Sequence, residues 1–197
     1  MKKILVVLVV LIITGCGKKA ELKTGDIIFQ TSKSNQSKAI ALATHSEYTH
    51  MGVILIRGKQ VLVFHAVNPV KYTPFEEWIK AGKNGHYVVK RPKRTIDGIP
   101  WASIEACLEE MEGKPYDKYF GWGDDKIYCS ELAWKLYMCT IGYKLCDLKK
   151  LSDFDLSNPH VKMMLKERYG DKIPLNEPVV SPADIFDSKE LYFVTEQ

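Results

Sequence analysis

Residues 50–67, HMGVILIRGKQVLVFHAV, constrain the fold more strongly than any other part of the chain. Two runs rich in Val, Ile and Leu are joined by the polar residues RGKQ at 57–60, which is the pattern of a β-hairpin. Residues that face each other across such a hairpin have numbers that add up to roughly 116 or 117, because the two strands run antiparallel about that turn. The sequence therefore predicts a strand pair and its register to within one residue.

Each strand of this hairpin carries one histidine. His50 begins the first strand, next to a polar loop, and His65 lies near the end of the second strand. In the predicted register His65 faces Met51 or Gly52, and a shift of one residue would bring both histidines onto one face of the sheet. One histidine could then orient the other, although two histidines on a hairpin are more often structural or solvent-exposed than catalytic.

Strands and helices are mixed along the rest of the chain. Further strands are predicted at 24–30, 86–92 and 190–195. Helices are predicted at 34–44, 73–83, 99–111, 128–142, 158–170 and 181–188. Strands that cluster and form hairpins, with helices gathered around them, indicate an α+β fold with a mostly antiparallel sheet. The sequence shows no internal repeat, so residues 23–197 are predicted to form one domain.

Two of the predicted helices carry clear signals at their ends. In the helix at 73–83, Thr73 is predicted to be the cap and Pro74 the first helical residue. The helix that begins near Tyr128 has Gly142 at its far end, where glycine commonly terminates a helix. Both helices are therefore predicted from more than their apolar spacing.

The first residues are predicted to be a signal that is removed. Two lysines precede an apolar run at 4–13, which is too short to anchor the chain by spanning a bilayer. The run ends in ITGC at 13–16, which fits the cleavage pattern of a lipoprotein signal. Residues 1–15 are then a lipoprotein signal peptide, Cys16 becomes the lipid-modified first residue, and 16–22 form a tether. The alternative is an ordinary secretory signal in which Cys16 has no role.

This interpretation predicts a lipoprotein of the bacterial cell envelope, either periplasmic or outward-facing, that is held to a membrane by its acyl chains. Removal of the two lysines lowers the formal net charge from +4 to +2. A net charge so close to zero gives no reason to expect a nucleic-acid partner.

Four cysteines remain after Cys16, at positions 107, 129, 139 and 146. Their spacing fits no zinc site and no disulfide framework, so the sequence predicts neither a metal nor another cofactor. Cys107 and Cys139 lie among apolar residues in helical patterns and are predicted to fill the core. Whether Cys139 pairs with Cys146 is left open.

Cys129 lies at the start of a predicted helix, in the segment YCSELAWKLY at 128–137. Unpaired backbone N–H groups and the positive end of the helix dipole favour a thiolate at such a position. A thiolate with a base beside it is a nucleophile near neutral pH. The alternative is a buried structural cysteine. Glu131, two residues further on, is expected to be solvated or bonded to a neighbouring loop.

Five short segments together resemble a known family. In chain order they are GDIIFQ at 25–30, HMGVIL at 50–55, FHAV at 64–67, GKPYD at 113–117 and YCSELAWKLY at 128–137. They are similar to the pieces of the NlpC-type cell-wall peptidases, but here the histidine comes before the cysteine. This order, with SPADIF at 181–186, resembles the circularly permuted papain-like amidases and cysteine peptidases of the YaeF/YiiX type. The resemblance covers nearly all of the exported chain and implies a permuted papain-like fold.

The resemblance also implies roles for four residues. Cys129 takes the position of the nucleophile, His50 that of the general base and His65 that of the third, polar residue. A neutral His65 could orient His50 but would not stabilise an imidazolium as a carboxylate does. Tyr116 takes the position of a loop tyrosine near the oxyanion site, and its alternative role is an aromatic packed over the core.

The implied function is that of an exported, lipid-anchored cysteine hydrolase that cleaves an amide bond without a metal or other cofactor. A small amide of the envelope, such as a cell-wall stem peptide, is the expected substrate. The alternatives are a lipid ester or N-acyl amide on the same scaffold, and an envelope-binding lipoprotein without catalysis. A charged groove would favour the peptide, and an apolar groove would favour the lipid.

Overall fold

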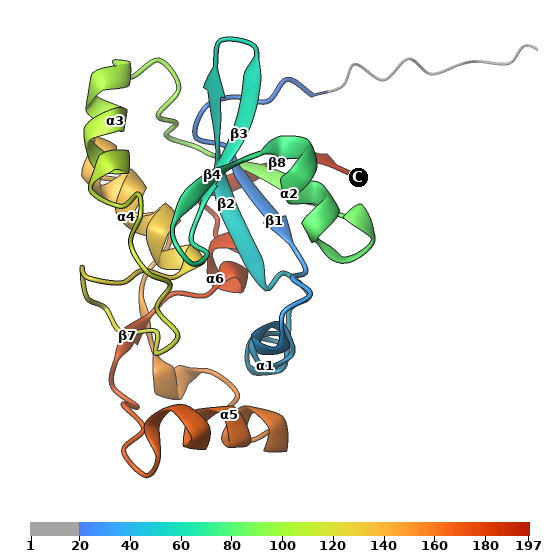
Figure 1. The fold of residues 1–197 in the computed structure, drawn as a ribbon, viewed down its shortest axis with the longest axis vertical. Helices are drawn as coiled ribbons and strands as arrows, with labels where there is room; N and C mark the ends of the chain where they lie inside the picture. The colour runs from blue at the N-terminus through green and yellow to red at the C-terminus, as the bar shows by residue number, and fades with distance from the viewer. Residues whose placement is uncertain (1–19) are drawn as a thin grey trace, which may run out of the picture.

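The computed structural model describes residues 20–197 (Figure 1). The predicted signal peptide at 1–15, the predicted lipidation site Cys16 and most of the tether at 16–22 lie outside the described residues. A six-stranded antiparallel sheet forms the centre of the molecule, in the spatial order β4-β3-β2-β1-β5-β8. Its strands are β1 (Ile27–Gln30), β2 (His50–Arg57), β3 (Gln60–His65), β4 (Lys71–Pro74), β5 (Val88–Pro92) and β8 (Leu191–Glu196).

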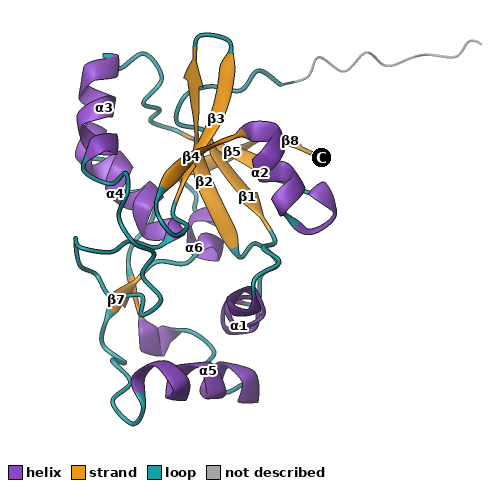
Figure 2. Ribbon diagram, viewed as in Figure 1, coloured by secondary structure: helices purple, strands orange, loops and turns teal. Residues whose placement is uncertain are grey.

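Helices cover both faces of this sheet (Figure 2). They are α1 (Asn35–Thr44), α2 (Phe75–Ala81), α3 (Trp101–Glu109), α4 (Cys129–Ile141), α5 (Pro159–Tyr169) and α6 (Pro182–Phe186), with the 3-10 turns η1 (Lys83–Gly85) and η2 (Leu151–Asp153). Strands β6 (Lys149–Lys150) and β7 (Pro178–Val179) form a separate small sheet. The predicted α+β class and the antiparallel sheet are confirmed. No helix within residues 20–197 is long and apolar enough to cross a bilayer.

The β2–β3 hairpin has the predicted register, with Val53 opposite Phe64 and Ile54 opposite Val63. Side chains alternate between the two faces of a strand, so the odd and even positions of β2 belong to different layers of the core. The odd positions pack with α4 in the larger apolar cluster. The even position Ile54 packs with Trp78 of α2 in the smaller one.

Near the start of α2, one strand and one cap differ from the prediction. Residues 71–74 form β4, which pairs with β3 and was not predicted. Thr73 is therefore a strand residue and not a helix cap. Helix α2 begins one residue later, with Pro74 at the N-cap and without a side-chain cap. The Thr-Pro-Phe-Glu-Glu pattern indicates a helix start correctly, but pairing with β3 extends the strand up to that point.

Helix α4 begins at Cys129, and its first turn is held by a buried carboxylate. Glu131 Oε2 accepts a hydrogen bond from the backbone N–H of Tyr128 at 3.2 Å, and Lys135 Nζ lies 2.9 Å from Glu131 Oε1. The carboxylate is fully buried, so the expectation of a solvated residue is wrong. The helix ends, as predicted, at Gly142 with a φ of 61°, a left-handed conformation that glycine adopts without a steric penalty.

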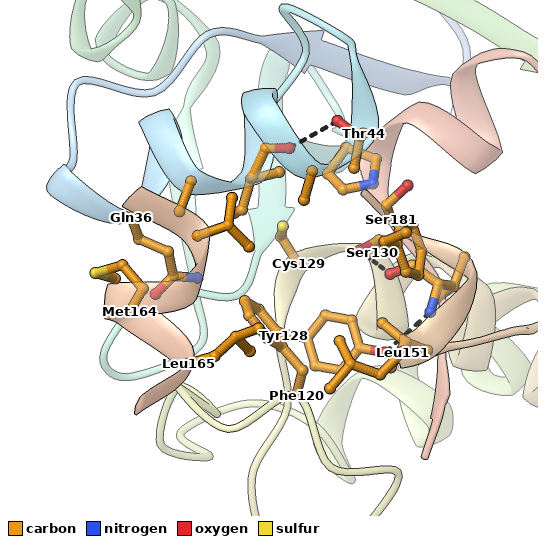
Figure 3. A pocket seen from close by; sticks show the side chains of 18 of the residues that line it. Gln36, Thr44, Phe120, Tyr128, Cys129, Ser130, Leu151, Met164, Leu165 and Ser181 are labelled. Atoms are coloured by element: carbon orange, nitrogen blue, oxygen red, sulfur yellow. Dashed lines mark hydrogen bonds between the residues drawn. The ribbon is translucent and has the colours of Figure 1, made fainter. Parts of the chain in front are cut away.

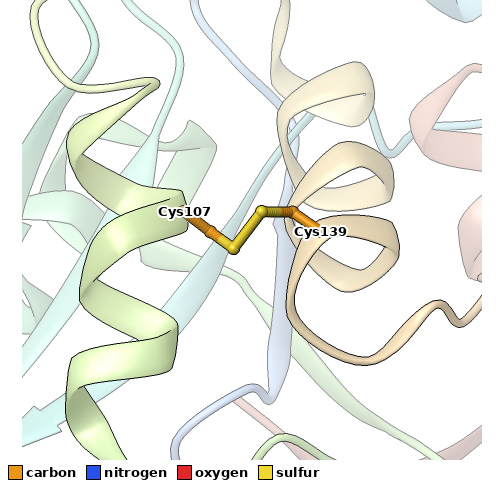
Figure 4. The surroundings of a disulfide bond; sticks show 2 residues. All are labelled: Cys107 and Cys139. Carbon is orange, nitrogen blue, oxygen red and sulfur yellow. A yellow bond between two sulfur atoms is a disulfide. The ribbon is translucent and has the colours of Figure 1, made fainter.

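Cys107 of α3 and Cys139 of α4 form a disulfide bond that joins the two helices (Figure 4). The prediction that both residues are core fillers is wrong. Cys107 does lie in the apolar core, but Cys139 is exposed. The two positions are on helices that pack together and come within bonding reach, with Cα atoms 6.0 Å apart. Cys129 and Cys146 form no disulfide within residues 20–197, and Cys139 does not pair with Cys146.

Removal of this bond is expected to lower the free energy of unfolding. The paired residues are 32 positions apart, and closure of a loop of that length is worth about 3–4 kcal/mol. Denaturant unfolding of Cys107→Ala/Cys139→Ala against the wild type measures the difference, with Cys146→Ala as the matched control for loss of a thiol. An unchanged transition midpoint in the double variant would contradict a stabilising role for the bond.

Candidate active site

The two hairpin histidines form a hydrogen-bonded pair. His50 Nε2 lies 2.9 Å from His65 Nδ1, and His65 Nε2 lies 2.9 Å from Thr73 Oγ1 in β4. No shift of register is needed, because the observed pairing continues to Gly52 opposite His65, on the same face as His50. A side chain at Gly52 would disturb the pair, since a Cβ there would lie 2.4 Å from Val63 Cγ1 and 3.0 Å from His65 Cβ.

Trp78 of α2 determines where the protons of this pair lie. Its indole N–H can only donate, and it is 3.3 Å from His65 Nδ1, which therefore carries no proton and accepts. His65 then has its proton on Nε2 and donates it to Thr73. The N–H of His50 Nε2 shares the single lone pair of His65 Nδ1 with the indole N–H and is the closer donor, at 2.9 Å. The Nδ1 of His50 then keeps a free lone pair. The network thus places His50 in the tautomer that a general base needs.

Burial keeps both imidazoles neutral. It lowers the pKa of His50 to about 4. Burial, with smaller contributions from the charges of His50 and Lys71, lowers the pKa of His65 to about 2. A neutral His50 at neutral pH is able to accept a proton, and a neutral His65 can orient it.

Cys129, the first residue of α4, lines a cavity of about 90 Å³ (Figure 3). Its side chain is almost fully buried. Burial raises the pKa of the thiol to about 11, although backbone N–H groups of Met51 and Ser130 act in the opposite direction. The sequence-based expectation of a lowered pKa is wrong here, because desolvation outweighs the helix N-terminus.

The thiol and the histidine pair approach β2 from opposite faces. Met51 packs with Cys129 in the cluster on the α4 side, whereas the His50 ring stacks on Trp78 with ring centroids 5.9 Å apart. The backbone N–H of Met51 acts to lower the pKa of the thiol, and His50 is the residue before Met51. Among the hydrogen bonds of residues 20–197, none joins Cys129 Sγ to His50 or His65.

Tyr116, which the resemblance places near the oxyanion site, lies in the loop before α4. Its loop is held to the start of α4 by backbone hydrogen bonds from Asp117 N to Ile127 O at 3.2 Å and from Ile127 N to Pro115 O at 3.1 Å. Both Tyr116 and Cys129 line the cavity. Burial and the neighbouring Cys129 raise the pKa of Tyr116 well above its ordinary value, so the phenol keeps its proton and can donate it.

The rest of the cavity wall is almost entirely apolar. Helix α1, the segment around η2, helix α5 and the residues before α6 supply it. The apolar residues are Ala39, Ile40, Ala43, Phe120, Leu151, Phe154, Leu156, Val161, Met164, Leu165, Val179, Val180 and Pro182. Of the charged side chains in the described part of the chain, only that of Arg168 reaches this wall. Within residues 20–197 there is no group of three or more His, Cys, Asp or Glu side chains that could hold a metal.

Four residues of this region were not identified from the sequence as parts of a site. Thr73 and Trp78 support the histidine pair, and Gln36 and Arg168 support Tyr116. The sequence contains a weak signal for Trp78, since a tryptophan in a short helix after the hairpin will pack on one of its faces. No sequence signal marks Gln36 and Arg168, which are 132 positions apart.

Residues 21–195 match a family described as "permuted papain-like amidase enzyme, YaeF/YiiX, C92 family". The chain belongs to the permuted papain-like amidase family. It is 49% identical over 175 residues to the uncharacterized protein YiiX of Escherichia coli strain K12, with 89% of this chain and 87% of the relative covered. The recognition made from the five sequence segments is thereby confirmed.

A solved structure of the same family has the same fold. It is titled "Crystal structure of metalloprotein yiiX from Escherichia coli O157:H7", and it matches 89% of this chain and 97% of its own with a TM-score of 0.84 and 49% identity. The permuted papain-like fold is therefore established, and the family supports a cysteine hydrolase.

The pKa values of the site predict how fast Cys129 reacts with iodoacetamide as pH changes. A raised pKa means that less thiolate is present at a given pH, so at pH 8.5 the folded protein should react at least about 100-fold more slowly at Cys129 than the unfolded chain. The rate should still rise beyond pH 9.5. Mass spectrometry of the alkylated cysteine measures it, with the guanidinium-unfolded protein as the reference. A midpoint below about 8.5 would contradict a neutral thiol.

Proposed function

We propose that this protein is a cysteine hydrolase that cleaves an amide bond, with Cys129 as nucleophile, His50 as general base and His65 as the residue that orients His50. The observation that carries the proposal is the hydrogen-bond network of His50, His65 and Trp78. This network leaves Nδ1 of His50 as a free base, and the next residue, Met51, has a backbone N–H that acts to lower the pKa of the Cys129 thiol.

Acylation begins from neutral partners. As Sγ of Cys129 attacks the carbonyl carbon, its proton passes to Nδ1 of His50, so a buried thiolate never has to exist alone. The resulting imidazolium donates its Nδ1 proton to the leaving nitrogen, and the C–N bond breaks to give a thioester and a free amine. The proposal requires that His50 and Cys129 come together when substrate binds, because no hydrogen bond joins them among the described residues.

Deacylation uses the same groups in the reverse order. His50 accepts a proton from a water molecule as the water oxygen attacks the thioester carbonyl, and it returns that proton to Sγ as the C–S bond breaks. The sum is an amide plus water giving a carboxylic acid plus an amine. Thr73 holds the outer end of the pair throughout, since it accepts from His65 Nε2 at 2.9 Å.

The oxyanion that forms in each half is stabilised by hydrogen bonds from the protein. In this proposal the donors are the backbone N–H of Cys129, at the start of α4, and the phenol of Tyr116. Each such donor contributes typically about 3–4 kcal/mol to the stability of the transition state. The alternative role for Tyr116, a packed aromatic, would give no such contribution.

The lining of the cavity favours an acyl chain as the group that Cys129 takes up. A charged stem peptide would leave its ionised groups without partners against the apolar walls of α1 and α5, which is costly. An N-acyl amide or a lipid ester would place its alkyl chain there instead. The cavity of about 90 Å³ is small beside ligand pockets of roughly 300–1,000 Å³, so it fits the first carbons of the chain.

No metal takes part in this proposal. The relative of known structure is titled a metalloprotein. The described residues of the present chain do not offer the three or more His, Cys, Asp or Glu ligands that a bound metal commonly needs. His50 and His65 are already paired with each other and with Thr73.

The proposal also places the enzyme at the bacterial cell envelope, with Cys16 lipid-modified after cleavage of residues 1–15. More than one acyl chain would hold it there stably. A hydrolase in that position meets lipids directly, which agrees with the apolar cavity.

Hydrolysis of simple anilides tests the activity. We expect release of nitroaniline from butanoyl p-nitroanilide, abolished in Cys129→Ala and reduced at least about 100-fold in His50→Gln. Each buried methylene is worth about 0.8 kcal/mol, so kcat/KM should rise roughly fourfold per carbon from acetyl to butanoyl. Alanine p-nitroanilide, with a charged amino group, should be a poor substrate. Absorbance at the nitroaniline band gives the rates.

Cys146→Ala is the matched control and should keep the wild-type rate. If a charged wall peptide is cleaved faster than the acyl anilides, the substrate is a peptide and not a lipid, and the proposed hydrolase activity still stands. Equal, Cys129-independent rates in all variants would instead favour an envelope-binding lipoprotein without catalysis.

Lipid attachment has its own test in a bacterial host. The full chain should be cut before Cys16 and should partition into detergent and membrane fractions, because its acyl chains would insert into the bilayer. Residues 20–197 contain no helix that could cross a membrane. Cys16→Ala should move the protein to the aqueous fraction. Mass spectrometry of the N-terminal peptide decides the case, and an unmodified Cys16 in the membrane fraction would refute the lipoprotein prediction.

A further inference from the structure

Tyr116 is hydrogen-bonded to two residues that the proposed reaction does not otherwise use. Gln36 of α1 donates from Nε2 to Tyr116 Oη at 3.0 Å. Arg168 of α5 donates from a terminal guanidinium nitrogen to Gln36 Oε1 at 2.9 Å. All three side chains line the cavity of Cys129, and Figure 3 shows Gln36 at its edge.

The direction of these hydrogen bonds follows from the chemistry of Arg168. A guanidinium has only donors, so the oxygen of the Gln36 amide must face it. The NH₂ group of the same amide must then face Tyr116. Tyr116 Oη therefore accepts from Gln36, and its own proton is left to point elsewhere.

The free direction for that proton is the cavity. Tyr116 is close enough to Cys129 for that neighbour to raise the pKa of its phenol, after burial. The phenol oxygen has one proton, and the bond from Gln36 occupies an acceptor position. The remaining O–H therefore points toward the place where a substrate carbonyl would lie beside the thiol.

We propose that Arg168 and Gln36 are positioning residues which, through a one-way chain of hydrogen bonds, make Tyr116 a donor to the oxyanion. This inference rests on the proposed function and deepens it. Arg168 reaches no reacting atom itself. It fixes the Gln36 amide, the amide fixes the phenol, and only the phenol touches the substrate.

The guanidinium of Arg168 is itself held in place. It lies over the ring of Phe120, 5.2 Å from the centroid, which is the geometry of a cation–π contact. Phe120 in turn packs edge-on against Tyr128, the residue before Cys129, with centroids 5.3 Å apart. The chain therefore joins α5, α1 and the loop before α4 around the thiol.

The substitution Gln36→Glu tests the chain, because it keeps the shape but reverses one hydrogen bond. A carboxylate can accept from Arg168, but it offers Tyr116 only an acceptor, so the phenol proton would turn away from the cavity. We expect kcat on butanoyl p-nitroanilide to fall roughly 100-fold, as in Tyr116→Phe, with KM changed less than about threefold. In the Tyr116→Phe background Gln36→Glu should cause no further loss.

Arg168 supplies a second pair of variants. Arg168→Lys keeps a donor-only group and should retain most of the activity, whereas Arg168→Gln lets the Gln36 amide turn over and should lower kcat roughly 10-fold. Again the loss should vanish when Tyr116 is Phe. Lys166→Gln is the control on the same helix, since Lys166 is an exposed residue that forms an ion pair with the exposed Asp171. Its rate should equal that of the wild type.

Two results would overturn the inference in distinguishable ways. If the loss of kcat in Gln36→Glu or Arg168→Gln multiplies with the loss in Tyr116→Phe, the two residues have a general structural role. The proposed hydrolase activity would not be affected by that result. Absence of Cys129-dependent hydrolysis in the wild type would remove the proposed function and this inference together. Circular dichroism and thermal unfolding of each variant separate loss of folding from loss of positioning.

Discussion

The hydrogen bond between His50 and His65 depends on one constraint, the register of the β2–β3 hairpin, and the rest of the site is arranged around it. Strand alternation puts the two histidines on the α2 face and Met51 on the α4 face. Trp78 then closes the histidine face, and Cys129 packs on the other. A slip by one residue would exchange the faces and break both arrangements.

The site is built on neutral groups because it is buried. The thiol at the helix start and the imidazole beside a tryptophan are both removed from water, and each pKa moves toward the uncharged form. Helix dipoles and backbone N–H groups act against that trend without reversing it. The protein therefore controls protons by fixing which nitrogen or oxygen holds them, through Trp78 at the histidine pair and through Arg168 and Gln36 at Tyr116.

Sequence patterns predicted those features that depend on neighbours in the chain. The hairpin, its register and the start of α4 at Cys129 follow from local spacing and from turn and cap residues. The sequence did not show that Thr73 belongs to a strand, since its pairing with β3 is decided by the sheet. For Glu131 the sequence left solvation and bonding to a neighbouring loop open. Two-residue spacing says where the side chain leaves the helix, but not that it will be buried beside Lys135.

The disulfide between α3 and α4 has a consequence for how the protein is made. Bonds of this kind form and persist in oxidising compartments, while cytosolic thiols are kept reduced. A chain that folds in the cytosol would have α4, the helix that begins with the nucleophile, fastened to α3 by packing alone. Protein prepared from a reducing compartment and protein prepared from an oxidising one therefore differ chemically at Cys107 and Cys139. The compartment of expression should be stated for each sample.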